Sequence, residues 1–195
     1  KIKGVRIAQP VSKADFDFES SQWSLDPDSK AVYHVQYNNE ITLNTYGQCI
    51  METEGDNAML IPQQLVAWDA ENDKPNTAKG AYLSVYAQVE TAEGARVYPN
   101  VDGMDYAWLA VPIDTKWEAG YKYVYTLDFT NGAGYSDPLD GPGTGGTVLG
   151  GAIKFTMDVN PWGEKATMEA TENMMIGKWA AARVEVQWTY SDGSI

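Results

Sequence analysis

The chain has 195 residues, 44% of them hydrophobic, and its 14 basic and 27 acidic side chains give a formal net charge of −13. Such an acidic surface repels phosphate backbones and anionic lipid, which argues against nucleic acid and against docking on a membrane through a basic patch. Cys49 is the only cysteine, so an internal disulfide and a cysteine-based metal site are excluded. No apolar run reaches the length of about 18 residues that a membrane-spanning helix needs.

The first part of the chain has the pattern of several short strands. Large apolar residues alternate with polar ones, and a period of two places the large side chains on one face of a strand. Pro10, Asp26 to Ser29 and Asn38-Asn39 interrupt the alternation and predict turns. The expected strands carry Val5 and Ile7, Phe16 and Phe18, Trp23 and Leu25, Tyr33 with Val35 and Tyr37, and Ile41 with Leu43.

Polar loops and longer strands follow in the middle of the chain. Residues 47–57 and 69–80 are polar, and we expect both segments to be loops. Residues 58–61 form a short apolar run between them. Residues 82–89 and 106–113 carry large or apolar side chains in both alternating series, which is typical of interior strands.

The clearest strand begins at Tyr121 and ends at Phe129. A helix would scatter its large residues around the circumference, whereas a strand gathers them on one face. Gly120 before the segment and Asn131-Gly132 after it predict turns. We therefore expect one face of this strand to lie in a core. The residues of that face are Tyr121, Tyr123, Tyr125, Leu127 and Phe129.

The C-terminal part combines a loop, two strands and one helix candidate. Residues 131–146 are rich in Gly, Pro and Asp and are expected to form a mobile loop, and residues 153–159 alternate as a strand. Glu164 to Ile176 is the helix candidate, because the preceding Asn160-Pro161 resembles a helix start. A last alternating strand carries Val184, Val186, Trp188 and Tyr190.

Many short strands with at most one short helix indicate an all-β sandwich. Sandwiches of this length commonly form one domain, so we expect residues 1–195 to be a single domain. Residues 163–195 would form its C-terminal extension, a helix or turn followed by the last strand. Because the sequence begins at Lys1 without methionine or a signal peptide, we expect a mature or trimmed fragment.

The sequence gives little support for a catalytic function. The only histidine, His34, lies in the middle of an expected strand, and no nucleophile motif flanks it. No phosphate-binding glycine motif follows a strand. We therefore predict no enzymatic activity. Paired carboxylates that hydrolyse glycosides stay open as an alternative, because a chain with 27 acidic residues always offers such pairs.

We expect no cofactor, with calcium as the one metal to consider. Clustered carboxylate oxygens are the ligands that calcium prefers. The spacing of an EF-hand is absent, since the first cluster lacks the following glycine and the late glutamate. The candidate ligands are Asp69, Glu71 and Asp73 in one loop and Asp137 and Asp140 in another.

Aromatic residues offer a second class of function, a secreted carbohydrate-binding module. Trp68, Trp117 and Trp162 lie at strand ends or in loops, where an indole ring could stack on a sugar. The alternation of Tyr121 to Tyr125 instead favours a place in the core for those rings. The three tryptophans are therefore the candidate ligand-contact aromatics.

Three segments in order resemble the fimbrillin-like family, surface pilins and adhesins of anaerobes that are also called type V pilins. Met59-Leu60-Ile61-Pro62-Gln63 resembles the family's (M/L)LIPQ segment, and Trp117-x-x-Gly120-x-x-Tyr123-x-Tyr125 resembles its W-x-x-G-x-x-Y-x-Y strand. Ile153-x-Phe155-x-Met157-x-Val159-x-Pro161-Trp162 resembles its closing strand. The resemblance covers most of residues 1–162.

This resemblance implies transthyretin-like, Greek-key β-sandwich domains, lipoprotein export and display at the outer membrane or in a fimbrium. It further implies polymerisation by strand exchange with other pilin subunits or with itself, and adhesion to a host surface protein or glycan. The sequence departs from the family pattern in having no lipoprotein cysteine near Lys1 and in continuing past Trp162.

The segment beyond Trp162 is the candidate for strand exchange. An extended strand fills an open row of backbone groups and places alternate side chains in pockets. Our hypothesis is that residues 183–190 are donated to a neighbouring subunit or fold back as an edge strand. Val184, Val186, Trp188 and Tyr190 suit either use.

Overall fold

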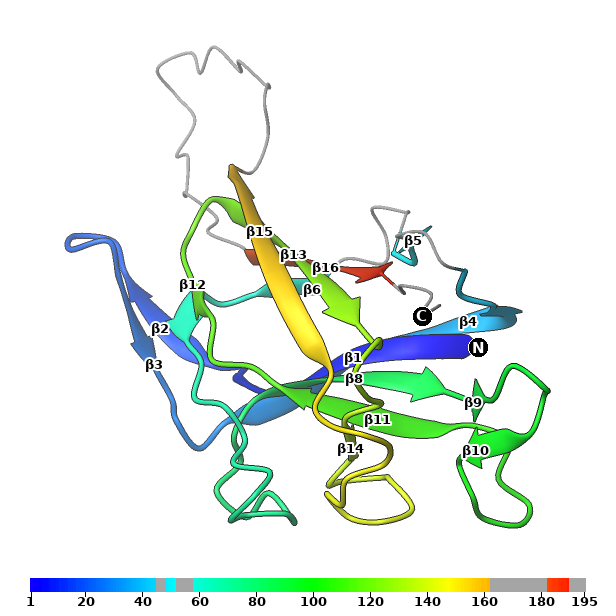
Figure 1. Cartoon of the computed structure of the whole chain (residues 1–195). Coiled ribbons are helices and arrows are strands. Elements are labelled where there is room, and N and C mark those ends of the chain that lie inside the picture. The colour runs from blue at the N-terminus through cyan, green and yellow to red at the C-terminus, as the bar shows by residue number, and fades with distance from the viewer. Residues whose placement is uncertain (45–47, 52–57, 162–181, 190–195) are drawn as a thin grey trace.

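The structure is a computed structural model that describes residues 1–44, 48–51 and 58–161 together with the backbone of residues 182–189. Two five-stranded sheets pack face to face, and three two-stranded ribbons lie around them (Figure 1). The described residues contain strands and turns but no helix. The prediction of an all-β sandwich is confirmed. The helix candidate Glu164 to Ile176 lies outside the described residues.

The first sheet is antiparallel throughout. Its rows run straight across the strands: Val5 pairs with Val35 on one side and Val85 on the other, and Val85 pairs with Leu109. These rows follow the alternation that the sequence predicted, with apolar residues on the inner face. In spatial order its strands are β14 (Tyr135–Ser136), β11 (Ala107–Pro112), β8 (Tyr82–Ala87), β1 (Ile2–Val11) and β4 (Lys30–Ile41).

The second sheet mixes antiparallel and parallel pairs. β13 and β15 pair antiparallel over their full length, from Tyr121 with Pro161 to Asp128 with Lys154. The last strand, β16, runs parallel to β13. In spatial order the strands are β15 (Lys154–Pro161), β13 (Tyr121–Asp128), β16 (Ala182–Thr189) and then both β5 (Gln48–Cys49) and β6 (Ala58–Leu60).

The core lies between the two sheets. Tyr123, Tyr125 and Leu127 of β13 are at most 2% exposed and belong to one cluster with the inner residues of the first sheet. The phenolic oxygens are satisfied: the Tyr125 hydroxyl accepts a hydrogen bond from Trp117 Nε1 at 2.9 Å, and the Tyr123 hydroxyl accepts one from the Glu118 amide at 2.6 Å. The inward face predicted for this strand is confirmed in its middle, while Tyr121 at its start is 38% exposed.

Residues 131–146 differ from their prediction as a mobile loop. The segment contains β14, and Ala133, Ser136 and Asp137 in it are at most 3% exposed. Glycine allows the close packing: a Cβ on Gly141 would collide with the backbone of Asp137. Few apolar residues suggested a loop that could not pack, but long-range polar contacts and close backbone approach hold it against the first sheet.

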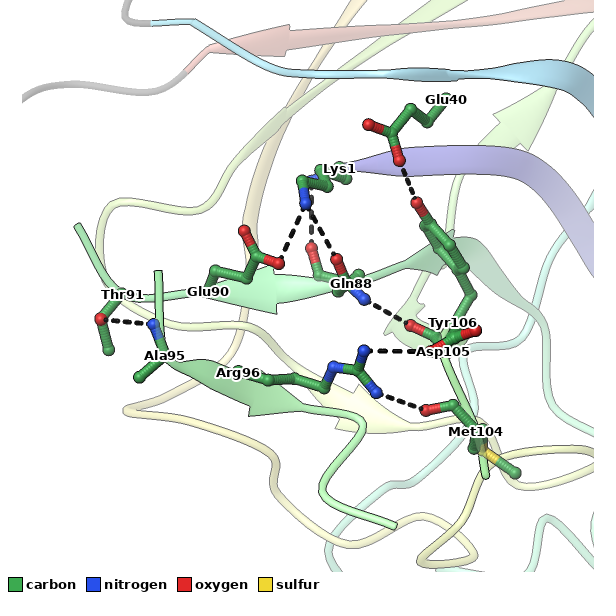
Figure 2. A network of polar contacts seen from close by, with 10 residues as sticks. All are labelled: Lys1, Glu40, Gln88, Glu90, Thr91, Ala95, Arg96, Met104, Asp105 and Tyr106. Atoms are coloured by element: carbon green, nitrogen blue, oxygen red, sulfur yellow. Dashed lines mark hydrogen bonds and ion pairs between the residues drawn. The ribbon is translucent and has the colours of Figure 1, made fainter. Parts of the chain in front are cut away.

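The two ends of the sandwich are built differently. At the end where the chain starts, polar contacts join Lys1, the end of β4, β9 (Val89–Glu90), β10 (Arg96–Tyr98) and the segment that precedes β11 (Figure 2). The α-amino group of Lys1 donates to the carbonyl of Gln88 at 3.0 Å, and Arg96 pairs with Asp105. At the opposite end lie the ribbon of β7 (Gln63–Gln64) with β12 (Lys116–Trp117) and the hairpin of β2 (Ala14–Asp17) with β3 (Gln22–Leu25).

Candidate assembly site

The last strand occupies the middle of the second sheet. β16 pairs with β13 on one side and with both β5 and β6 on the other. Its ladder with β13 begins at Lys122 opposite Arg183 and ends at Asp128 opposite Thr189. The segment therefore folds back on its own sandwich, in an internal position rather than as the edge strand that the sequence suggested.

The register places the predicted assembly series beside the core. Val184, Val186 and Trp188 are the backbone partners of Tyr123, Tyr125 and Leu127, respectively. These partners on β13 are buried between the sheets. The fourth residue of the predicted series, Tyr190, lies outside the described residues.

Taking β16 away would divide the second sheet. β5 and β6 pair with this sheet only through β16 among the described residues, so nothing else described there links them to β13. An unpaired strand edge exposes a row of backbone donors and acceptors, and buried groups of that kind are almost always paired. The gap between β13 and β6 is thus a slot shaped for one extended strand.

The connection to β16 is much longer than its position requires. β15 ends at Pro161 opposite Tyr121, and β16 begins with Ala182 and Arg183, the latter opposite Lys122. Both ends of the connection therefore lie at the same end of β13, roughly 10 Å apart across two strand spacings. A fully extended segment of this length, residues 162–181, could reach roughly 70 Å. The chain is long enough to place β16 in its own slot or in that of a neighbour.

Two of the three candidate ligand-contact tryptophans are core residues, which corrects the interpretation of them as a sugar platform. Trp68 is 2% exposed, packs against Tyr82 and Tyr135, and donates from Nε1 to the Asp73 carbonyl at 2.6 Å. Trp117 is 1% exposed and donates to Tyr125. Their positions at strand ends suggested exposure, but both rings are buried and each indole N–H has an acceptor within the protein. Trp162 lies outside the described residues.

The carboxylates considered for calcium have protein partners. Asp137 is fully buried, forms an ion pair with Arg6 at 2.7 Å, and accepts hydrogen bonds from Tyr82 and Ser84. Arg6 also pairs with Asp140 at 2.5 Å. Burial beside Asp137 raises the pKa of the Tyr82 hydroxyl well above its usual range. In this cluster the Arg6 guanidinium is the cation that pairs with both carboxylates.

The other acidic loop is organised by its own backbone. Asp69 accepts from the amides of Glu71 and Asn72, and Asp73 accepts from those of Thr77 and Ala78. The pKa of both carboxyls is lowered, for Asp69 foremost by the side-chain amide of Asn72 and for Asp73 foremost by the side-chain hydroxyl of Thr77, with the backbone bonds adding to the effect. Within the described ranges, no three potential metal ligands of the His, Cys, Asp or Glu type gather.

Sequence reasoning missed the cluster of Arg6 and Asp137. Its one local signal is an arginine between the apolar residues Val5 and Ile7. Arg6 is 8% exposed, and its guanidinium carbon lies 4.2 Å from the ring centroid of Trp108. The partner carboxylate lies far along the chain in a segment with no strong pattern, so spacing alone could not identify it.

The described residues also contain no helix that is both long and apolar enough to cross a membrane.

A model of the fimbrillin-like family matches residues 1–162. No curated protein and no solved structure matches the chain. The matched range contains the three segments whose resemblance to this family the sequence showed. It includes all described strands except β16, which begins at Ala182.

Proposed function

The chain belongs to the fimbrillin-like family, and we propose on this premise that it is a subunit of a cell-surface fimbria that assembles by strand complementation. In this mechanism residues 182–189 of one subunit fill the slot between β13 and β6 of the next. The proposal extends to export as a lipoprotein and to display at the outer membrane. Its role is structural and adhesive rather than enzymatic.

The observation that carries the proposal is the internal position of a strand with a long connection. β16 is bordered on both sides by strands from the matched part of the chain. A strand donated by a neighbour would make the same ladder, so exchange conserves the contacts within the slot. The balance between a closed monomer and an assembly then depends mainly on protein concentration and on the connection.

Parallel pairing with β13 fixes the direction of exchange. A donated strand has to enter beside Lys122 and end beside Asp128 to keep the register. A slip by one residue would move the alternate series of β16 to the other face of the sheet. Strand complementation therefore selects one register as well as one slot.

Adhesion, in this proposal, belongs to the outer face of the first sheet, since assembly uses the second. Tyr86 lies between Tyr106 and Trp108 on this side, with ring centroids 5.6 Å and 5.1 Å apart. All three rings are half-buried. Such rings offer flat contact area to a host protein or glycan. A glycan array and a binding assay on host-cell surface proteins, each with the Tyr86→Ala chain beside the native one, test this part.

Electron microscopy of the concentrated full chain, beside a chain truncated after Gly177, tests assembly. We expect fibres from the full chain and none from the truncated chain, because only the former carries β16. Adding a peptide of residues 178–195 to the truncated chain should fill the slot and leave it monomeric. Fibres of equal length from both chains would contradict the proposal, as would a full chain that stays monomeric at every concentration.

A further inference from the structure

The hairpin of β2 and β3 stands apart from both sheets. Its two strands pair with each other, Ala14 with Leu25 and Phe16 with Trp23, and form a separate ribbon. In Figure 1 the hairpin extends beyond the sandwich at the end where β12 lies. A two-stranded ribbon has little stability of its own in water. A feature that projects in this way needs a physical explanation.

One face of the hairpin is largely aromatic, with Phe16 and Trp23 half-buried and Phe18 and Leu25 open to solvent. Phe16 contacts Phe18 edge to face at 5.1 Å and Trp23 at 4.8 Å between ring centroids. Phe18 is 79% exposed, the largest exposure among the large hydrophobic residues that the structure describes, and Leu25 is 36% exposed. Contiguous exposed apolar side chains typically mark an interaction surface. We call Phe16, Phe18, Trp23 and Leu25 the aromatic face.

Local hydrogen bonds hold this face in shape before any partner arrives. Asp17 Oδ1 accepts from the Glu19 amide at 2.8 Å and Asp17 Oδ2 from the Ser20 hydroxyl, which fixes the tip. At the base, Lys13 pairs with Asp26 at 3.3 Å. A surface ordered in advance loses less conformational entropy on binding.

The base of the hairpin lies close to the start of β16. The Gln63 side chain accepts from the Val11 amide at 2.7 Å and donates to the Val11 carbonyl at 3.0 Å, next to the hairpin. Three residues before Gln63, Leu60 is the backbone partner of Ala182, the first residue of β16. The hairpin is therefore anchored beside the point where an exchanged strand would leave or enter the sandwich.

We propose that the aromatic face docks on a second copy of this chain, at the junction where β16 crosses from one subunit to the next. The inference rests on the proposed function, since strand exchange brings the second copy to this end of the sandwich. Tethering supplies a high effective concentration, so a modest apolar contact is sufficient there. The hairpin thus adds a second contact that orients neighbouring subunits.

The negative charge of the hairpin allows a second copy of the chain to be distinguished from a basic partner. Residues 13–28 hold one lysine and five acidic residues, a net charge of −4, on a chain of net charge −13. Two copies repel each other, so salt should strengthen their contact by screening the repulsion. A basic peptide or protein would be attracted to the acidic hairpin, and salt would weaken its binding.

Photo-crosslinking of the full chain tests the inference. Phe18→p-benzoylphenylalanine keeps an aromatic side chain at this exposed position and reacts with groups in contact with it. The matched control is Val101→p-benzoylphenylalanine, because Val101 is 45% exposed and follows β10 at the opposite end. The concentrated native chain is imaged in parallel, and both variants are irradiated at low and high salt.

We expect fibres together with chain-to-chain adducts from position 18, several-fold more than from position 101 and more at high salt. Fibres without adducts from position 18, or with adducts that decrease with salt, overturn the inference and leave the proposed function standing. Adducts without fibres would show that the aromatic face contacts another chain without strand exchange, which overturns its place at the junction between subunits. The absence of both fibres and adducts rejects the inference together with strand exchange.

Discussion

The two sheets of this sandwich are completed in different ways. Every strand of the first sheet comes from residues 2–136, and all of its pairs are antiparallel. The second sheet has a parallel strand at its centre that comes from residues 182–189. The first sheet is therefore complete within residues 2–136, whereas the second depends on a strand at the end of a long connection.

This difference gives the two sheets different roles: the first supports the fold, and the second provides the site for assembly. The first sheet is additionally fixed on its outer side, where Trp68, Tyr82 and Ala110 form a second small core with Ala8 and Ala70. An exchangeable strand in such a sheet would have to break that cover. The second sheet instead offers a slot whose filling strand can come from either of two chains, with the first sheet as a constant support.

Among the changes considered, loss of β16 should lower the stability of the protein most, through the second sheet. A chain truncated after Gly177 exposes the edge of β13 beside Tyr123, Tyr125 and Leu127, and each such side chain contributes about 1.5–3 kcal/mol when buried. We expect the melting temperature to fall by at least about 10 °C, since 1 kcal/mol corresponds to about 2–4 °C at this size. Calorimetry measures it, and added peptide 178–195 should restore most of the loss. An unchanged melting temperature would mean that β16 does not complete the sheet.

Breaking the buried ion pair should have the next largest effect, and only on the first sheet. Arg6→Met leaves the carboxylate of Asp137 buried without its cation, which costs about 3–5 kcal/mol. Denaturant unfolding measures this loss. Arg96→Met is the matched control, because its pair with Asp105 is exposed and contributes about 0–1 kcal/mol. Equal losses for both variants would show that burial does not set the strength of the pair.

A single hydroxyl of the second sheet should have a smaller effect. Tyr125→Phe removes the acceptor of the Trp117 indole N–H, and an unsatisfied buried donor costs about 1–3 kcal/mol. Tyr121→Phe changes the same strand at a position that is 38% exposed and should be nearly neutral. Urea unfolding of both variants compares them, and a neutral Tyr125→Phe would argue against the buried hydrogen bond.

A rise in pH around neutrality should leave the stability of both sheets unchanged, and a further rise to high pH should lower it. Burial raises the pKa of Tyr125 in the second sheet and of Tyr98 beside the first to about 12, from an ordinary value of 10.0. Both are neutral acids in the native state, so their contribution is complete below pH 10 and is lost as the pH rises towards 12. Thermal melts across this range measure it. A rise in stability above pH 10 would contradict the assignment.

The sequence predicted the strands well because period two is a local signal. Tyr123, Tyr125 and Leu127 are inward as expected, and the interior strands around Val85 and Leu109 lie in the middle of the first sheet. The pattern marks which residues face a core. It does not state which strands are neighbours.

The misses depend on contacts between distant parts of the chain. Asp137 looked like a loop residue because its partner, Arg6, is at the other end of the sequence. The sequence predicts a ligand surface at Trp68 and Trp117 because nothing local reveals the acceptors of their indole groups. The alternation of β16 was visible, but its internal slot depends on β5 and β6, which are too short to give a pattern.

The central claim is that β16 of one subunit fills the slot of another, and a disulfide trap tests it most directly. Gln187 is the antiparallel partner of Cys49, the only cysteine of the chain, and antiparallel partners lie about 4.5–5.5 Å apart between Cα atoms, within the range of a disulfide. One chain keeps native Cys49, and the other carries Cys49→Ser with Gln187→Cys. A disulfide that joins Cys49 to position 187 in this mixture can form only between chains.

As a control, Gln187→Cys in the native background should close the bond within one chain or between chains, which verifies the register. We predict that the mixture, concentrated under mild oxidation, gives a covalent two-chain product that reducing agent separates. A mixture that stays uncrosslinked while the control closes its bond within single chains would show that β16 remains in its own sandwich, and would contradict assembly by strand exchange.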